Sequence, residues 1–153
     1  MTYPTQPQAA GNGVLLGQKA PDIEHVIAAW LAPLGRAGNA YRVGDPLPFR
    51  LVTRITGTED VTCGLDNPTI SVHTLCDKML GYAAAATESD KTHEAMLDLG
   101  RYLDDITMPD NTIVSIDYLK VFMSPIWLRF EDVMILRKVG RYTIGTCYDP
   151  PAV

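Results

Sequence analysis

The sequence predicts an α+β fold, with a mostly antiparallel sheet of about four strands and two main helices packed on one face. Two segments carry apolar residues at the helical period. Four others are rich in β-branched or aromatic residues and have the length of strands. The order along the chain is α-β-β-α-β-β, and strand pairs separated by a helix are typical of helices laid on an antiparallel sheet.

The first helix is predicted to begin near residue 22 and to end at Pro33 and Gly35. Its apolar stripe has the i, i+3, i+4, i+7 spacing and comprises Ile23, Val26, Ile27, Trp30, Leu31 and Leu34. Residues 1–18, which precede it, are polar and contain Pro and Gly, so we expect a flexible N-terminal arm. The sequence then predicts one domain over residues 19–149 and a short tail over 150–153.

The two middle strands are predicted at residues 49–56 and 69–76. In the first of them the side chains alternate, and we expect the face with Phe49, Leu51 and Ile55 to be the buried one. Asp77 then suits the N-cap of a second helix that continues to about Asp105. Its polar region at residues 88–90 indicates a break or a kink.

The last third of the chain, residues 112–148, predicts two long strands interrupted at Ser124-Pro125. Its polar positions are mainly Lys and Arg, set among large apolar side chains. Trp, Tyr and Arg are the residues that dominate protein interfaces. We therefore expect this segment to contact other protein, through Trp127, Phe130, Arg129, Arg137, Arg141 and Tyr142.

Composition excludes some classes of function. The chain has 153 residues, 46% of them hydrophobic, and a net charge of −5, so a general basic surface for nucleic acid is not expected. Basic and aromatic residues do alternate late in the chain, which left a single-strand nucleic-acid face as a weaker alternative. No apolar run approaches the roughly 20 residues that cross a bilayer, so no membrane partner is expected.

The acidic charge is concentrated in one segment. Residues 77–110 contain three basic and eight acidic residues, a balance of −5 that equals the net charge of the whole chain. The simpler interpretation is a solvated helix face. The sharper hypothesis is a surface that does not hold DNA, with Glu94 and Asp98 facing a channel.

No set of residues predicts catalysis or metal binding. His73 and Cys76 lie near Cys63 in sequence, but positions 73 and 76 of a strand point to opposite faces, and a structural zinc site needs four ligands. The three cysteines, Cys63, Cys76 and Cys147, are expected to be plain thiols. We expect no enzyme, no catalytic residue, no metal and no cofactor.

Three strings carry a resemblance to a known family: PFRLVTRITGTED, ISVHTLCD and TIVSIDYLKVFMSPIWLRFEDVMILRKVGRYTIGTCY. Together they resemble the tail terminator proteins of long-tailed (siphovirus) phages of mycobacteria and related actinobacteria, over about residues 20–148. The resemblance implies an α+β subunit of a homohexameric ring that stops growth of the tail tube and joins it to the head connector.

The partners that the resemblance implies are further copies of the chain, the tail tube protein and the head-tail connector or stopper protein. Genomic DNA would pass through the ring without sequence-specific binding. The protein would be found in the virion at the tail-neck junction, after assembly in the cytoplasm of the bacterial host. Two alternatives stay open: another phage neck protein (head-completion or stopper), and a small cytosolic ligand-binding domain.

Overall fold

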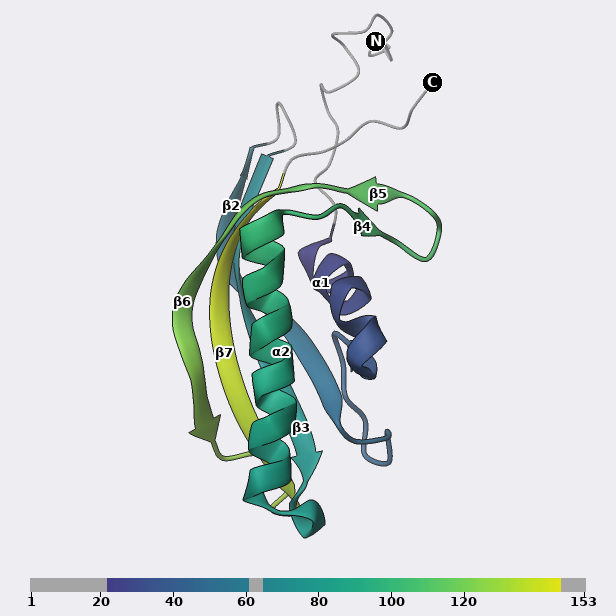
Figure 1. Cartoon of the computed structure of the whole chain (residues 1–153), viewed down its shortest axis with the longest axis vertical. Coiled ribbons are helices and arrows are strands. Elements are labelled where there is room, and N and C mark those ends of the chain that lie inside the picture. Colours follow the sequence, from purple (N-terminus) through teal and green to yellow (C-terminus); the bar gives the residue numbers. More distant parts are fainter. Residues whose placement is uncertain (1–21, 61–64, 147–153) are drawn as a thin grey trace, which may run out of the picture.

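A computed structural model describes residues 22–60 and 65–146. It confirms the predicted α+β class and element order, with two α-helices on one face of a five-stranded sheet (Figure 1). The helices are α1 (Ile23–Leu31) and α2 (Tyr82–Tyr102). The predicted arm at 1–18, the tail at 150–153, and Cys63 and Cys147 lie outside the described residues.

The main sheet has the strand order β1-β2-β3-β7-β6. Its strands are β1 (Arg36–Gly38), β2 (Phe49–Asp60), β3 (Leu65–Asp77), β6 (Ile116–Leu128) and β7 (Ile135–Thr146). The four long strands are antiparallel to their neighbours, and only the short β1 runs parallel to β2. A small second sheet pairs β4 (Ile106–Thr107) with β5 (Ile113–Val114), above the N-terminal end of α1 in Figure 1.

The first helix follows the predicted stripe but is shorter. Asp22 is its N-cap and accepts a hydrogen bond from the backbone N–H of Glu24 at 3.0 Å. The α-helix ends at Leu31 and tightens into a 3₁₀ turn, Ala32–Leu34, because a proline is accepted early in such a turn but not inside an α-helix. Trp30 donates from its indole nitrogen to the carbonyl of Ala95 at 2.9 Å, which joins α1 to α2.

The second α-helix begins four residues later than the sequence predicts, with Gly81 as its N-cap in place of Asp77. Asp77 is an N-cap, but of a short 3₁₀ turn, Lys78–Leu80, and not of α2. Its carboxylate accepts a hydrogen bond from the backbone N–H of Met79 at 2.9 Å. Gly81, with φ of 92°, separates this turn from α2. From there α2 is a single 21-residue helix, without the break expected at residues 88–90. Near its end Gly100 lies against Leu119 of β6, where a Cβ atom would meet the leucine at 3.3 Å.

The core lies between the helices and the sheet, and it contains the face of β2 that was expected to be exposed. Arg50 and Val52 are fully buried, whereas Leu51 is half-buried and Ile55 is exposed. The expected orientation is therefore wrong for most of β2, because the helices cover the face that carries Arg50, and of Phe49, Leu51 and Ile55 only Phe49 is buried. The core residues of this layer are Ile23, Val26, Ile27, Leu31, Val52, Ile70, Val72, Met96, Leu99, Ile106, Val114, Ile116, Tyr142 and Ile144.

A smaller apolar cluster lies on the sheet face away from the helices. Phe49, Leu75 and Ile135 form its buried part, and Tyr41, Leu47, Leu51 and Phe130 pack around them. Tyr41 meets Phe49 and Phe130 edge to face, with ring centroids 5.3 and 6.1 Å apart. The connection before β2 and the residues after β6 thus cover one end of this face.

Candidate protein-interaction surface

The strand β6 forms one edge of the main sheet, since it is last in the strand order and pairs only with β7. The break predicted at Ser124-Pro125 is an irregularity inside a continuous strand. The register of β6 on β7 shifts at three places, and each shift places one extra residue on β6, which makes a β-bulge. Bulges and a proline protect an edge strand against backbone pairing with another chain. A protein that binds at this edge is therefore expected to contact the side chains of β6 and not to extend the sheet through backbone hydrogen bonds.

Exposed apolar side chains concentrate along this edge and at the adjoining end of the molecule. The described part of the chain exposes fifteen large hydrophobic residues, and ten of them lie here. They are Met79, Leu80, Tyr82, Val121, Phe122, Ile126, Trp127, Leu128, Val133 and Met134. Single exposed apolar residues are ordinary, but a concentration of this kind is typical of a protein-binding surface.

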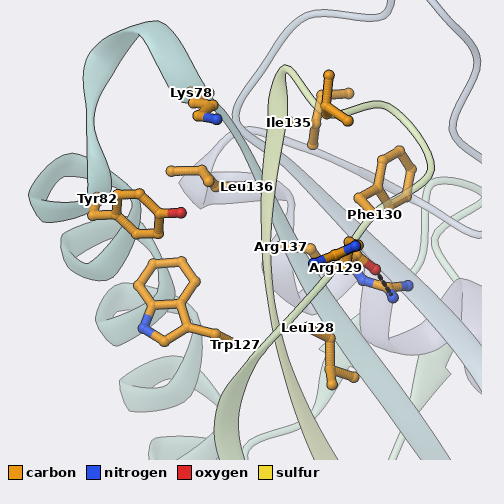
Figure 2. Close-up of a pocket in the computed structure, with 10 residues that line it drawn as sticks. Lys78, Tyr82, Trp127, Leu128, Arg129, Phe130, Ile135, Leu136 and Arg137 are labelled. Carbon is orange, nitrogen blue, oxygen red and sulfur yellow. Dashed lines mark hydrogen bonds between the residues drawn. The ribbon is translucent and has the colours of Figure 1, made fainter.

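A pocket of about 420 Å³ lies at this end, where β6 finishes, β7 begins and α2 starts (Figure 2). Trp127 and Tyr82 meet edge to face in it, with ring centroids 5.2 Å apart. The ammonium of Lys138 lies 5.1 Å from the centroid of the Trp127 ring. The lining residues are Lys78, Tyr82, Trp127, Leu128, Arg129, Phe130, Val133, Ile135, Leu136 and Arg137. Four residues predicted from the sequence as contacts, Trp127, Arg129, Phe130 and Arg137, are thus brought together.

The charged residues that line the pocket are all basic. They are Lys78, Arg129 and Arg137, and no carboxylate lines it. Arg137 donates from Nη2 to the carbonyl of Arg129 and lies over the ring of Phe130, at 5.5 Å from its centroid. A guanidinium held in this way is positioned to bind a carboxylate. The pocket therefore suits a partner segment with an apolar side chain beside an acidic one.

The two other predicted contact residues lie elsewhere. Arg141 pairs with Ser71 and Met123 in the middle of the sheet and is half-buried. Tyr142 is 1% exposed and belongs to the core, where its hydroxyl lies 2.7 Å from Nδ1 of His93. Burial raises the pKa of this tyrosine well above its usual value, so it stays neutral. The strand period could have separated Tyr142 from Arg137 and Arg141, because even and odd positions of a strand point to opposite faces of the sheet.

His73 belongs to the same sheet face as Arg137 and Arg141, which sequence reasoning missed. It pairs with Val139 in the ladder, between Arg137 and Arg141. Burial, followed by the charges of the two arginines, lowers its pKa to about 4, so His73 is neutral at pH 7. Buried nitrogens of all three side chains lack a hydrogen-bond partner: His73 Nδ1, Arg137 Nε and Arg141 Nε. The alternation of residues 69–76 was the available signal for this face.

The acids proposed to face a channel, Glu94 and Asp98, lie on α2, and two of the four acids of this helix are already paired. Asp98 forms an ion pair with Arg101 at 3.0 Å. Glu88 binds Arg50 and Lys91, each at 2.9 Å. In the part of the chain that the structure covers, Asp90 and Glu94 are exposed and form no salt bridge. The free acidic charge of this helix is therefore centred on Asp90 and Glu94.

Cys76 is 4% exposed, and burial followed by the charge of Glu88 raises its pKa to about 11. A thiol of this kind is a poor nucleophile at neutral pH. Within residues 22–60 and 65–146 no three His, Cys, Asp or Glu side chains are grouped as metal ligands. In the same residues, no helix has the length and apolar character needed to cross a bilayer.

No protein-family model matches this sequence, and neither does any curated protein. Solved chains with a similar arrangement exist, and one of them comes from the virion of a native gene transfer agent (GTA) particle, with a TM-score of 0.46 and 16% sequence identity. The alignment covers 80% of this chain and 85% of that chain. At this score and identity, the likeness assigns no role to any side chain.

Proposed function

We propose that this chain is a structural virion protein, a phage tail terminator whose homohexameric ring caps the tail tube and joins it to the head connector. The observation that carries the proposal is the exposed apolar and basic surface along β6 and in the pocket where β6 finishes and β7 begins. The strings SPIW and ILRKVGRYTIG, in which the resemblance to tail terminators is strongest, lie in β6 and β7. The resemblance and the exposed surface thus fall on the same strands.

A ring of identical subunits suits this distribution of surface. In a cyclic hexamer each subunit uses two different patches, one for each neighbour. The β6 edge provides one patch, and the pocket provides another for a second copy, for the tail tube protein or for the connector protein. An acidic helix α2 is compatible with genomic DNA passing through the ring, since phosphates are held by basic residues.

The test replaces Trp127, which is 41% exposed and lies outside the buried clusters. We expect Trp127→Ala to leave the monomer folded and to impair assembly, because a single aromatic anchor can contribute about 2 kcal/mol of binding. Circular dichroism measures the fold, and capping of purified tail tubes together with virion yield measures assembly. Tyr102→Ala is the matched control, since Tyr102 is an exposed aromatic at the far end of α2.

Capping also separates the neighbouring hypotheses. A head-completion or stopper protein would use a similar surface, but it would bind the connector and leave tail tubes free to grow. A chain that stays monomeric at every concentration and binds neither tubes nor connector would contradict a role in the neck. That result would favour the small ligand-binding domain, with the basic aromatic pocket as its site.

A further inference from the structure

A second hollow lies on the side of the molecule opposite β6. It is a groove of about 610 Å³ between α1, β1 and the β4–β5 hairpin. Its walls are made mainly of small or apolar residues: Ala28, Ala29, Ala32, Ala37, Gly38, Met108, Pro109 and Val114. In the strand order, β1 and β6 are the two outermost strands, and in Figure 1 α1 and β6 lie on opposite sides of α2. The groove is thus at one edge of the subunit and β6 is at the other.

The most exposed aromatic side chain on β6 is a product of a bulge. Val121 pairs with Tyr142 and Met123 pairs with Arg141, which are adjacent residues of β7. Phe122 is therefore the extra residue, and a bulge turns such a side chain away from the regular alternation of the strand. Phe122 is 67% exposed, and it makes no ring contact with any aromatic residue that the structure describes.

The two features are complementary in shape and charge. Walls of alanine and glycine leave room for a large planar ring, and burying a phenyl ring removes much apolar surface from water. The polar residues of the groove are His25, Thr112 and the anion Asp110, whose carboxylate accepts the N–H of Thr112 at 3.0 Å. Hydrogen bonds from Thr112 lower the pKa of this carboxyl, so it is ionised. On β6 the exposed Lys120 stands two residues before Phe122.

We propose that the groove receives Phe122 of a neighbouring copy of this chain, with Lys120 of that copy near Asp110. The inference rests on the ring proposed above and names its subunit contact. The contact is heterologous, because the inserted side chain and the groove lie at opposite edges of one subunit. It proceeds through side chains, since the bulges and Pro125 leave β6 poorly suited to backbone pairing.

The experiment places a carboxylate on each side of the contact. Phe122→Glu removes the inserted ring. Ala28→Glu puts a charge into the apolar groove, and glutamate is a good helix former, so α1 should stay intact. Each variant alone should associate at least about tenfold more weakly than the wild type. When mixed, the two variants should form a one-to-one dimer that does not grow. The Phe122→Glu variant keeps its groove and the Ala28→Glu variant keeps its Phe122, so each pair can form one contact and no further subunit can add.

Sedimentation velocity on the full chain gives all of these readings. Thr87→Glu, an exposed position of α2 outside both surfaces, is the matched control and should associate like the wild type. Circular dichroism establishes that every variant is folded. For a variant that does not fold, Phe122→Ser and Ala32→Ser replace the glutamate pair, with the same expected results.

Three outcomes would overturn the inference. If the wild type assembles and neither substitution weakens assembly, the contact lies elsewhere while the ring stands. If only Phe122→Glu is impaired and the mixture forms no dimer, Phe122 contacts a surface other than the groove. If the wild type does not associate at any concentration and does not assemble on tail tubes, the proposed function itself is wrong.

Discussion

At the scale of single residues, His73 shows how its neighbours set a pH dependence. It lies on the sheet face away from the helices, beside Arg137 and Arg141. Its pKa in the folded chain is about 4, lowered from 6.5 by burial and then by the two arginines. Above pH 6.5 the imidazole is neutral in both the folded and the unfolded state. Below that value the unfolded state takes up the proton first, so stability falls as the pH drops toward 4.

We expect His73→Gln to remove part of this loss. Between pH 7 and pH 4.5 the free energy of unfolding of the wild type should fall by about 1–3 kcal/mol more than that of the variant. Urea denaturation at several pH values measures the difference. Ser71→Ala, a non-titrating change on the same strand, should shift the curve without changing its slope. Parallel curves for wild type and His73→Gln would contradict the assignment.

At the scale of elements, a buried polar network fastens α2 to the sheet. Arg50 is fully buried on β2 and donates to Thr92 Oγ1 at 3.0 Å and to Glu88 Oε1 at 2.9 Å. It also reaches the carbonyls of Leu34 and Glu88 at 3.3 and 3.2 Å. Thr74 of β3 completes the network through Thr92 at 3.0 Å. Burial alone would raise the pKa of Glu88, but hydrogen bonds from Lys91 and Arg50 more than offset it and the pKa is lowered.

Arg50→Ala should lower the free energy of unfolding by about 3–5 kcal/mol, because it leaves buried oxygens without their donor. Lys91→Ala is the matched control, since Lys91 holds the same carboxylate from the solvent side. Its cost should stay below about 1 kcal/mol. Urea denaturation of both variants decides the point, and equal losses would mean that the buried guanidinium has no special role.

The elements also show what the sequence could and could not predict. The apolar stripe of α1 and the β-branched runs of β2 and β3 were sufficient for type and order, because they depend on local period. The buried face of β2 was predicted wrongly, because Leu51 and Ile55 are apolar while Arg50 is charged. Only the packing of α2 reveals that Arg50 has partners for its donors. Ser124-Pro125 predicts a break where the structure has a bulge, because a bulge and a break look alike in sequence.

The same reasoning applies to the candidate surface. Trp127, Arg129 and Phe130 are close in sequence, and β7 returns Arg137 to them directly, so their grouping could be predicted from a hairpin. Tyr82 and Lys78 complete the pocket from a distant segment, and no local pattern indicated them. The groove lies between α1, β1 and the β4–β5 hairpin, and no pattern in the sequence predicts that hairpin.

At the scale of the whole molecule, charge is divided between layers. The outer side of α2 carries the free acids Asp90 and Glu94, whereas the edge and the far face of the sheet carry Lys120, Arg129 and Arg141. In a ring this division allows an acidic lining and basic contacts between proteins. Such a lining would let DNA slide, since counterion release makes binding to basic residues strong.

We predict that Asp90→Lys combined with Glu94→Lys slows or stalls DNA ejection while tails still form. The test changes Asp90 and not Asp98, because Asp98 is already paired with Arg101. The control is Asp90→Asn with Glu94→Gln, which removes the negative charge without adding a positive one and should eject normally. Ejection measured on purified virions gives the result. Normal DNA ejection by the lysine variant would contradict the hypothesis that α2 lines the channel. So would an electron-microscopy map of the assembled neck that places α2 on the outer wall of the ring.

The buried thiol of Cys76 makes the packing of this molecule measurable from within. It lies in a small cluster with Ala85 of α2 and Leu136 of β7, so a reagent reaches it only when helix and sheet separate. The rate at which a thiol reagent alkylates Cys76 therefore measures how often helix and sheet separate, in the way that amide exchange reports local unfolding. In a chain with Cys63 and Cys147 changed to serine, Cys76 would be the single reporter. Comparing the alkylation rate of Cys76 in free and in assembled subunits would show how much assembly in a ring suppresses this local opening.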